Sequence, residues 1–175
     1  PGQGQARDAF EVLSTAGDTH LGGDDIDHLL LELFTREIAA RLGGPAARRG
    51  TIDLPPQTRK QMVQLAEQVK IRLSERDTAS IRIDLGSGDA YERTVTRDEM
   101  ETMIAPLVER TIRACERALR DAKILRLDGT PLGPNEANEA STSGVGVVVL
   151  VGGSTRIPLV RRRVGEFFGL DPYTA

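Results

Sequence analysis

Two stretches of the chain carry hydrophobic residues at helical spacing. In residues 25–42 the apolar positions recur every three or four residues, which predicts an amphipathic helix that ends before Gly43. Residues 57–75 repeat this pattern and predict a second helix, separated from the first by a loop at residues 46–56. Each helix has one apolar face to bury, so both must pack against other elements of the chain.

Other stretches alternate in the way that strands do. Residues 78–85 and 90–95 alternate apolar and polar side chains around a Gly-Ser-Gly-Asp turn, which predicts a β-hairpin. Residues 10–15 alternate as well and predict a short strand. Residues 145–151 are nearly all apolar, which is typical of a strand buried on both faces.

The second half of the chain predicts helices with recognisable ends. Thr96 and Glu99 have the spacing of a capping box, so a helix is expected from there to about residue 104. Pro106 suits the first turn of a helix and not its interior, so we expect a joint near residue 105 and a new helix to about residue 123.

The order of elements is typical of an α/β fold: strand, helix, helix, hairpin, helix, helix, strand and a last helix at residues 158–168. Residues 22–104 carry their own hairpin and helices, so we expect them to form a subdomain inserted into one built from residues 1–21 and 105–175. Residues 125–144 are rich in Gly, Pro, Asn, Ser and Thr and are expected to be the least ordered segment.

Composition narrows the function classes. The chain has 175 residues and a net charge of −3 at pH 7, which argues against a nucleic-acid-binding surface. No apolar run approaches the roughly 20 residues that a membrane span requires. The single cysteine, Cys115, excludes an internal disulfide and lies in an apolar run, where we expect it in the core. Neither histidine has a partner at metal spacing, and no set of residues resembles a catalytic centre.

Two glycine pairs mark places where backbone could approach an anion. Gly152 and Gly153 follow the apolar strand and precede a helix, where consecutive N–H groups can bind phosphate. Just beyond them, the flat guanidinium of Arg156 could stack on a base. Gly22 and Gly23 also precede a helix, although the two aspartates that follow would repel phosphate unless they turn away. The alternative is that both pairs are tight turns with no ligand.

A polar stripe is expected on the second helix. Glu67, Lys70 and Ser74 share one face because they lie three and seven residues apart. They could hold a sugar and a base, or they could form a solvated edge with a Glu67–Lys70 ion pair.

Four stretches, taken together and in order, resemble the ATPase domain of the seventy-kilodalton heat-shock (DnaK-type) chaperones. They are AGDTHLGGDDID, the helix with the polar stripe, ALRDAK and LVGGSTRIP. The resemblance extends from about residue 10 to residue 170. Within this family, three stretches most resemble the sequences of the HscA-type branch, which serves iron–sulfur cluster assembly. They are FEVLSTAGDTHLGGDDIDHLL, IAPLVERTIRACERALRDA and RVGEFFG.

This resemblance implies an actin-like (ribonuclease H-like) fold, in which two lobes enclose a nucleotide. The chain would be most of the second lobe, with residues 1–21 and 105–175 as part of subdomain IIA and residues 22–104 as subdomain IIB. It also implies a cofactor, ATP or ADP with Mg²⁺. The implied roles are Gly23 beside the phosphates; Glu67, Lys70 and Ser74 in the adenosine pocket; Gly152, Gly153 and Ser154 along the nucleotide; and Arg156 against the adenine.

The chain also departs from the family pattern. Ile71 stands where many members have a second basic residue, so one base-stacking partner is absent, and residues 125–144 look like an insertion. The first lobe, the glycine-rich phosphate loop, the catalytic lysine, the magnesium-binding aspartates and the peptide-binding domain have no counterpart in this sequence. We therefore expect no ATP hydrolysis from this chain alone. We also expect an open sheet edge that favours self-association or partial disorder of the sheet.

The resemblance further implies partners and a location. These are a J-domain cochaperone, an iron–sulfur scaffold protein and a client peptide bound by a domain outside this chain, in the bacterial cytoplasm. No nucleic acid or membrane is expected as a partner. Two other readings stay open at this point: a lobe of another actin-like ATP enzyme, such as a sugar kinase, and an interaction module that binds no nucleotide.

Overall fold

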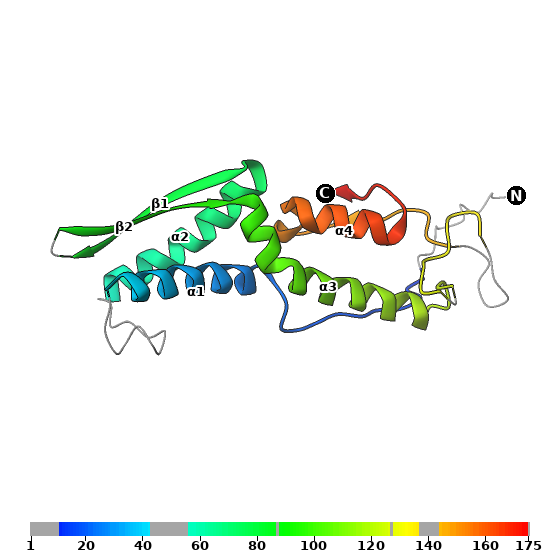
Figure 1. Cartoon of the computed structure of the whole chain (residues 1–175). Coiled ribbons are helices and arrows are strands. Elements are labelled where there is room, and N and C mark those ends of the chain that lie inside the picture. Colours follow the sequence, from blue (N-terminus) through cyan, green and yellow to red (C-terminus); the bar gives the residue numbers. More distant parts are fainter. Residues whose placement is uncertain (1–10, 43–55, 87, 127, 137–143, 175) are drawn as a thin grey trace, which may run out of the picture.

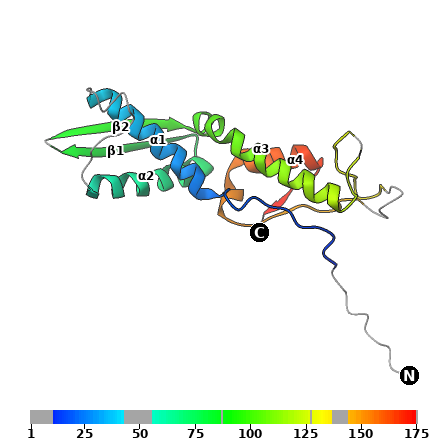
Figure 2. The same cartoon turned by 90° about the horizontal axis from the view of Figure 1, so that it is seen from below.

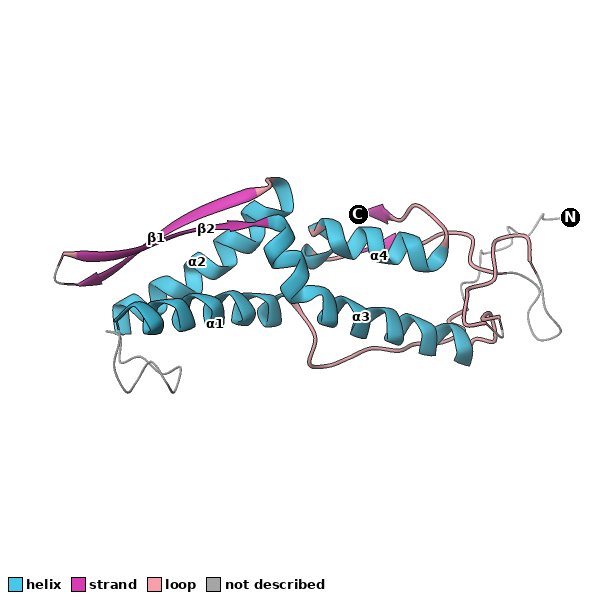
Figure 3. Cartoon of the chain, in the orientation of Figure 1, coloured by secondary structure: helices cyan, strands magenta, loops and turns pink. Residues whose placement is uncertain are grey.

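The molecule is elongated, with one long helix shared by its two halves (Figure 1). The computed structural model describes residues 11–42, 56–86, 88–126, 128–136 and 144–174. The loop expected between the first two helices therefore lies almost entirely outside the described residues. Figure 3 shows that helices dominate the described chain and that strands occur in two small sheets. The mixed α/β class expected from the sequence is confirmed at this level.

One half consists of two helices beneath a hairpin. Both helices lie on the same face of the hairpin, as Figures 1 and 2 show from two directions. These elements begin and end within two residues of the predicted positions: α1 (Gly23–Leu42), α2 (Pro56–Glu75), β1 (Thr78–Gly86) and β2 (Asp89–Thr96).

The core of this half lies between the helices and the inner face of the hairpin. β1 alternates buried and exposed residues, so that Ala79, Ile81 and Ile83 point toward the helices. Phe34 on α1 and Met62 on α2 are almost fully buried and belong to the same cluster. The period-two and period-3.6 patterns thus meet in one core, as expected from the sequence.

The helix α3 (Arg97–Asp121) begins at the predicted cap, where the Thr96 hydroxyl accepts a hydrogen bond from the Glu99 N–H at 3.1 Å. The predicted joint near residue 105 is wrong, because α3 continues through Pro106. The helix changes direction between its two parts (Figure 1), as expected where a proline removes one backbone donor. Ile104 and Val108, on either side of Pro106, pack into the same core and hold the helix together.

The other half contains α4 (Pro158–Phe168) and a two-stranded parallel sheet. α4 ends at Gly169, whose left-handed backbone conformation (φ 64°) closes the helix as predicted. The predicted strand at residues 145–151 is reduced to β3 (Val149–Leu150), paired with β4 (Tyr173–Thr174).

The expectation that this strand is buried on both faces is wrong. Val147, Val149 and Val151 are 57–74% exposed. Val148, Val149 and Leu150 line a groove with α3 and α4, and of these Val148 and Leu150 are partly buried by the two helices. No element among the described residues covers the opposite face of the strand.

The strand predicted at residues 10–15 is also absent from the part that can be tested, because residues 11–18 have no regular structure. Val12 and Leu13 are exposed, and no described strand offers these residues a hydrogen-bonding ladder. The segment runs beside α3 (Figures 1 and 2). Arg110 holds it there through the Asp18 carboxylate at 2.6 Å, which fixes the approach to α1.

The described part of the segment expected to be least ordered is a hydrogen-bonded turn. The Arg126 N–H donates to the Thr130 carbonyl at 2.8 Å, and Leu125 bridges to Pro131. Leu132 is buried beneath this turn. Residues 125, 126 and 128–136 are thus more regular than expected, whereas residues 127 and 137–143 lie outside the described part of the chain, so the expectation for the whole segment stays a prediction.

Candidate functional site

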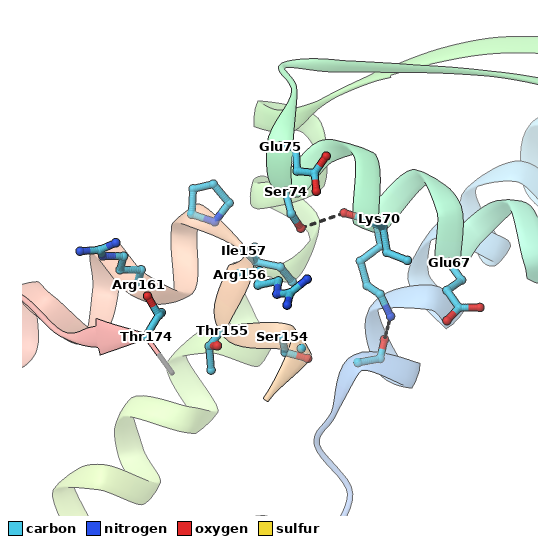
Figure 4. A pocket seen from close by; sticks show the side chains of 14 residues that line it. Glu67, Lys70, Ser74, Glu75, Ser154, Thr155, Arg156, Ile157, Arg161 and Thr174 are labelled. Atoms are coloured by element: carbon cyan, nitrogen blue, oxygen red, sulfur yellow. Dashed lines mark hydrogen bonds between the residues drawn. The ribbon is translucent and has the colours of Figure 1, made fainter. Parts of the chain in front are cut away.

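A cleft of about 960 Å³ opens between the two halves of the molecule. One wall is the end of α2, the other is a 3₁₀ turn, η2 (Gly153–Arg156), with the start of α4, and the first residue of α1 lies between them (Figure 4). Seven of the eight residues that the sequence proposed for a nucleotide site line this cleft: Gly23, Glu67, Lys70, Ser74, Gly153, Ser154 and Arg156. Gly152 does not line it and immediately precedes the 3₁₀ turn.

Gly23 lies where the two walls meet. A Cβ atom at this position would be 3.2 Å from Lys70 Nζ and 3.3 Å from Ser154 Oγ, whereas one at Gly22 would have no neighbour within 4 Å. The absence of a side chain at Gly23 therefore keeps the floor of the cleft open. Asp25 has turned back to accept a hydrogen bond from the Gly22 N–H at 2.7 Å, so its carboxylate is engaged in a local cap.

The polar stripe of α2 faces η2 across the cleft (Figure 4). The Glu67–Lys70 pair that the sequence left open as an alternative is not what engages the lysine. Lys70 Nζ instead lies 2.6 Å from Asp27 Oδ2 and 3.1 Å from the Gly23 carbonyl oxygen. The Ser74 hydroxyl donates to the Lys70 carbonyl at 3.0 Å, so its oxygen can still accept a hydrogen bond from a ligand.

The opposite wall is a turn that only glycine can enter. Gly152 has φ 103° and ψ 163°, a backbone conformation that is essentially restricted to glycine. Gly153 has open space around its Cα, and the Thr155 hydroxyl closes the turn on the Gly152 carbonyl at 2.6 Å. Arg156 follows on the exposed rim, and within the described ranges its guanidinium makes no hydrogen bond or ion pair.

The described residues that line this cleft offer groups that can bind a polar or charged ligand. Its walls offer one ammonium, two guanidiniums, two carboxylates, hydroxyls and glycine backbone, and no described lining residue is a nucleophile hydrogen-bonded to a base. Among the described residues, no group of three His, Cys, Asp or Glu side chains could hold a metal ion. None of the described helices is long and apolar enough to cross a membrane.

Cys115 lies outside the cleft, on the apolar groove between α3 and α4. It is half-buried rather than fully in the core, and burial raises the pKa of its thiol. A thiol in this setting stays protonated and unreactive at neutral pH.

Sequence reasoning missed several residues of the site. Asp27 holds Lys70 from a different helix, 43 residues away in the sequence, and no local pattern connects the two. Its only signal is its position four residues after Gly23, which places both on the same side of α1. Five further residues of the second half also line the cleft: Thr155, Ile157, Pro158, Arg161 and Thr174.

Comparison with known proteins places these features in a family. The family model described as "Hsp70 protein" matches residues 5–175. The chain is similar to "Chaperone protein HscA" of Cronobacter sakazakii (41% identical) and of Citrobacter koseri (43%), and to "Chaperone protein HscA homolog" of Vibrio cholerae (40%). Each alignment covers 97% of this chain and 22–23% of the relative, so the chain spans less than a quarter of these proteins. The resemblance to the HscA-type branch is thereby confirmed.

Proposed function

The chain belongs to the Hsp70 family, and we propose that it supplies one side of the nucleotide cleft of an ATP-dependent chaperone. The observation that carries this proposal is the gathering of seven predicted residues, from three separate parts of the sequence, around one cleft. A set of unrelated turns and solvated edges has no physical reason to converge in this way. The family assignment also replaces the alternative of a sugar-kinase lobe.

In this proposal the phosphates lie near Gly23 and the turn at Gly152–Gly153. The first N–H groups of a helix are free to bind anions, and Gly23 begins α1. Ser154 Oγ lies close to Gly23 and adds a hydroxyl on the opposite side. The two glycine pairs predicted from the sequence thus serve the same end of one ligand.

The adenosine lies between the stripe of α2 and η2. Lys70 and Ser74 offer a donor and an acceptor to the sugar and base, while Glu67 lies at the exposed mouth of the cleft. Arg156, with no competing partner within the described ranges, lays its guanidinium over the adenine ring. The second basic residue of many relatives is replaced by Ile71, which also lines the cleft and offers apolar contact to the base.

The remaining parts of the proposal concern the whole chaperone. We propose that the groups that bind Mg²⁺ lie outside the described residues of this chain. The catalytic lysine and the peptide-binding domain of the whole chaperone lie outside them as well. We place residues 22–104 in subdomain IIB and residues 1–21 and 105–175 in subdomain IIA of the second lobe. From the HscA-type relatives we propose a role in iron–sulfur cluster assembly in the bacterial cytoplasm, with a J-domain cochaperone and an iron–sulfur scaffold protein as partners.

A calorimetric titration of ADP, with Mg²⁺ and phosphate present, tests the nucleotide site. One side of a cleft should bind at about millimolar Kd, or about −4 kcal/mol. Arg156→Ala should abolish measurable binding. Arg113→Ala removes the same charge from an exposed position on α3 that does not line the cleft, and should bind like the wild type.

Two results would overturn the proposal. Equal loss in both arginine variants would show that only the overall charge matters. A chain that binds no ADP, alone or within the full-length chaperone, would instead be an interaction module without a nucleotide.

A further inference from the structure

Lys70 is held in place by a residue that does not itself line the cleft. Asp27 Oδ2 lies 2.6 Å from Lys70 Nζ, and the side chains of the two residues are only 18% and 15% exposed. The lysine comes from α2 and the aspartate from α1, so the pair links the two helices directly beneath the cleft. Its low exposure distinguishes it from the surface ion pairs of this protein, such as Arg41–Asp89.

The hydrogen bonds around this pair leave Lys70 one N–H donor that can bind a ligand. An ammonium group has three donors, of which one goes to Asp27 and one to the Gly23 carbonyl. The third has no acceptor among the described residues and is available to a ligand in the cleft that Lys70 lines. Because the Asp27 carboxylate compensates the charge, Lys70 presents a fixed hydrogen-bond donor there rather than a free positive charge.

The carboxylate depends on the lysine in turn. Asp27 Oδ1 is buried and has no hydrogen-bond partner among the described residues, so Lys70 is the only cation that compensates it there. The strong mutual dependence of two such groups means that removing one alone costs more than removing both.

We propose that Asp27 is a positioning residue that makes Lys70 recognise the uncharged nucleoside and not the phosphates. This inference rests on the proposed nucleotide site and adds a determinant of its specificity. Without the carboxylate, Lys70 would regain its rotational freedom, and its positive charge would no longer be compensated. Recognition of adenosine would then weaken, while attraction for phosphate would persist or increase.

The test compares three ligands on variants of the whole chain: adenosine, ADP and pyrophosphate. Asp27→Asn keeps the shape of the side chain and removes its charge. It should weaken adenosine and ADP about three- to tenfold, because Lys70 must again be immobilised on binding, and should leave pyrophosphate equal or tighter. Asp24→Asn is the matched control, since it removes the same charge from an exposed position on the first turn of α1. It should leave adenosine unchanged.

Two further variants separate positioning from structural damage. Asp27→Glu restores the carboxylate and should recover most of the adenosine affinity. In a Lys70→Met background, Asp27→Asn should have no further effect on adenosine, because the residue acts only through the lysine. Equal weakening of all three ligands by Asp27→Asn, or an unchanged affinity for adenosine, would overturn the inference.

A measurement on the wild-type chain keeps the test decisive even if a variant fails to fold. The chain has three lysines, Lys60, Lys70 and Lys123, so ¹³C-labelled lysine gives three Cε signals in an NMR spectrum. The Lys70 signal should move with adenosine and not with pyrophosphate, and the reverse would contradict the inference. A wild type that binds none of the ligands overturns the proposed function too. Loss of ADP in Arg156→Ala without an effect of Asp27→Asn overturns only the role of Asp27.

Discussion

Gly23→Ala is expected to strengthen the fold slightly and to weaken the ligand site. Gly23 is the first residue of α1 and its φ is not in the left-handed region, so alanine is compatible with the backbone. Replacing a glycine at such a position stabilises a protein by about 0.4–1 kcal/mol through the unfolded chain. The same methyl group would lie 3.2 Å from Lys70 Nζ and 3.3 Å from Ser154 Oγ, closer than the 3.4–4 Å of ordinary contact.

The two side chains must therefore give way by a few tenths of an ångström. Both atoms lie at the ends of side chains and can shift at little cost to the fold, but the shift moves Lys70 Nζ from the position set by Asp27 and the Gly23 carbonyl, at 2.6 Å and 3.1 Å. A displaced Lys70 ammonium weakens its hydrogen bond to the ligand, and because one hydrogen bond contributes about 0.5–1.5 kcal/mol net, an ADP affinity about two- to tenfold weaker is expected. The methyl group also occupies the floor of the cleft.

Gly22→Ala is the matched control, because a Cβ at that position meets no atom within 4 Å. Gly23→Ala should raise the urea midpoint of unfolding, and calorimetry should find weaker ADP binding in Gly23→Ala and not in Gly22→Ala. Equal ADP affinity in the two variants would refute the claim that Gly23 keeps the floor of the cleft open. A lower urea midpoint in Gly23→Ala alone would show that the contacts with Lys70 and Ser154 cannot relax.

Three further predictions concern the rest of the chain. The backbone N–H of His20 and the Arg110 guanidinium hold the pKa of Asp18 below its ordinary value, so this stabilisation is present above about pH 4 and is lost as the pH falls through the lowered pKa. Between pH 5 and pH 2, the urea midpoint of Asp18→Asn should therefore fall less steeply with decreasing pH than that of the wild type. The same pH dependence in both proteins would contradict this. Val149→Lys should reduce concentration-dependent association in sedimentation experiments, since Val149 is an exposed apolar residue of the short strand β3. A wild type with one sharp, concentration-independent unfolding transition would refute the expected self-association. Gly152→Ala should destabilise the chain by about 1–3 kcal/mol because of its φ of 103°, and an unchanged urea midpoint would show that the turn adapts.

Elements whose signals are local were predictable from the sequence. α1, α2 and the hairpin have their own periodicity and their own turns, and Gly169 ends α4 as its position predicts. Thr96 caps α3 because the required partner, the Glu99 N–H, is three residues away. In each case the residues that decide the structure are neighbours in the chain.

The predictions that failed depended on distant groups. Pro106 predicts a helix break by local rules, yet the burial of Ile104 and Val108 in one core keeps the helix continuous. Residues 11–15 and 145–151 have the alternating or apolar pattern of strands, but a strand forms only where another strand pairs with it. Among the described residues, β4 is the only partner of the stretch 145–151, and residues 11–15 have none.

The candidate site divides in the same way. Family motifs located seven residues of the cleft, since glycine pairs and a polar helical stripe are visible in a single sequence. The Asp27–Lys70 pair was out of reach because it joins two helices 43 residues apart. Cleft residues that follow Arg156 in the sequence, such as Arg161 and Thr174, were likewise missed. They line the cleft only because of where α4 and β4 pack in the fold.

The continuity of α3 through Pro106 has a mechanical consequence. The part of the helix from Pro106 to Asp121 is about 22 Å long at 1.5 Å per residue. A change of about 10° in the bend at the proline would carry its far end through about 4 Å. α4 is attached to this arm by the Arg163–Glu109 ion pair and to the part of α3 before the proline by Arg162–Glu101, so a change in the bend would strain one of these two pairs and thereby resist a change in the width of the cleft.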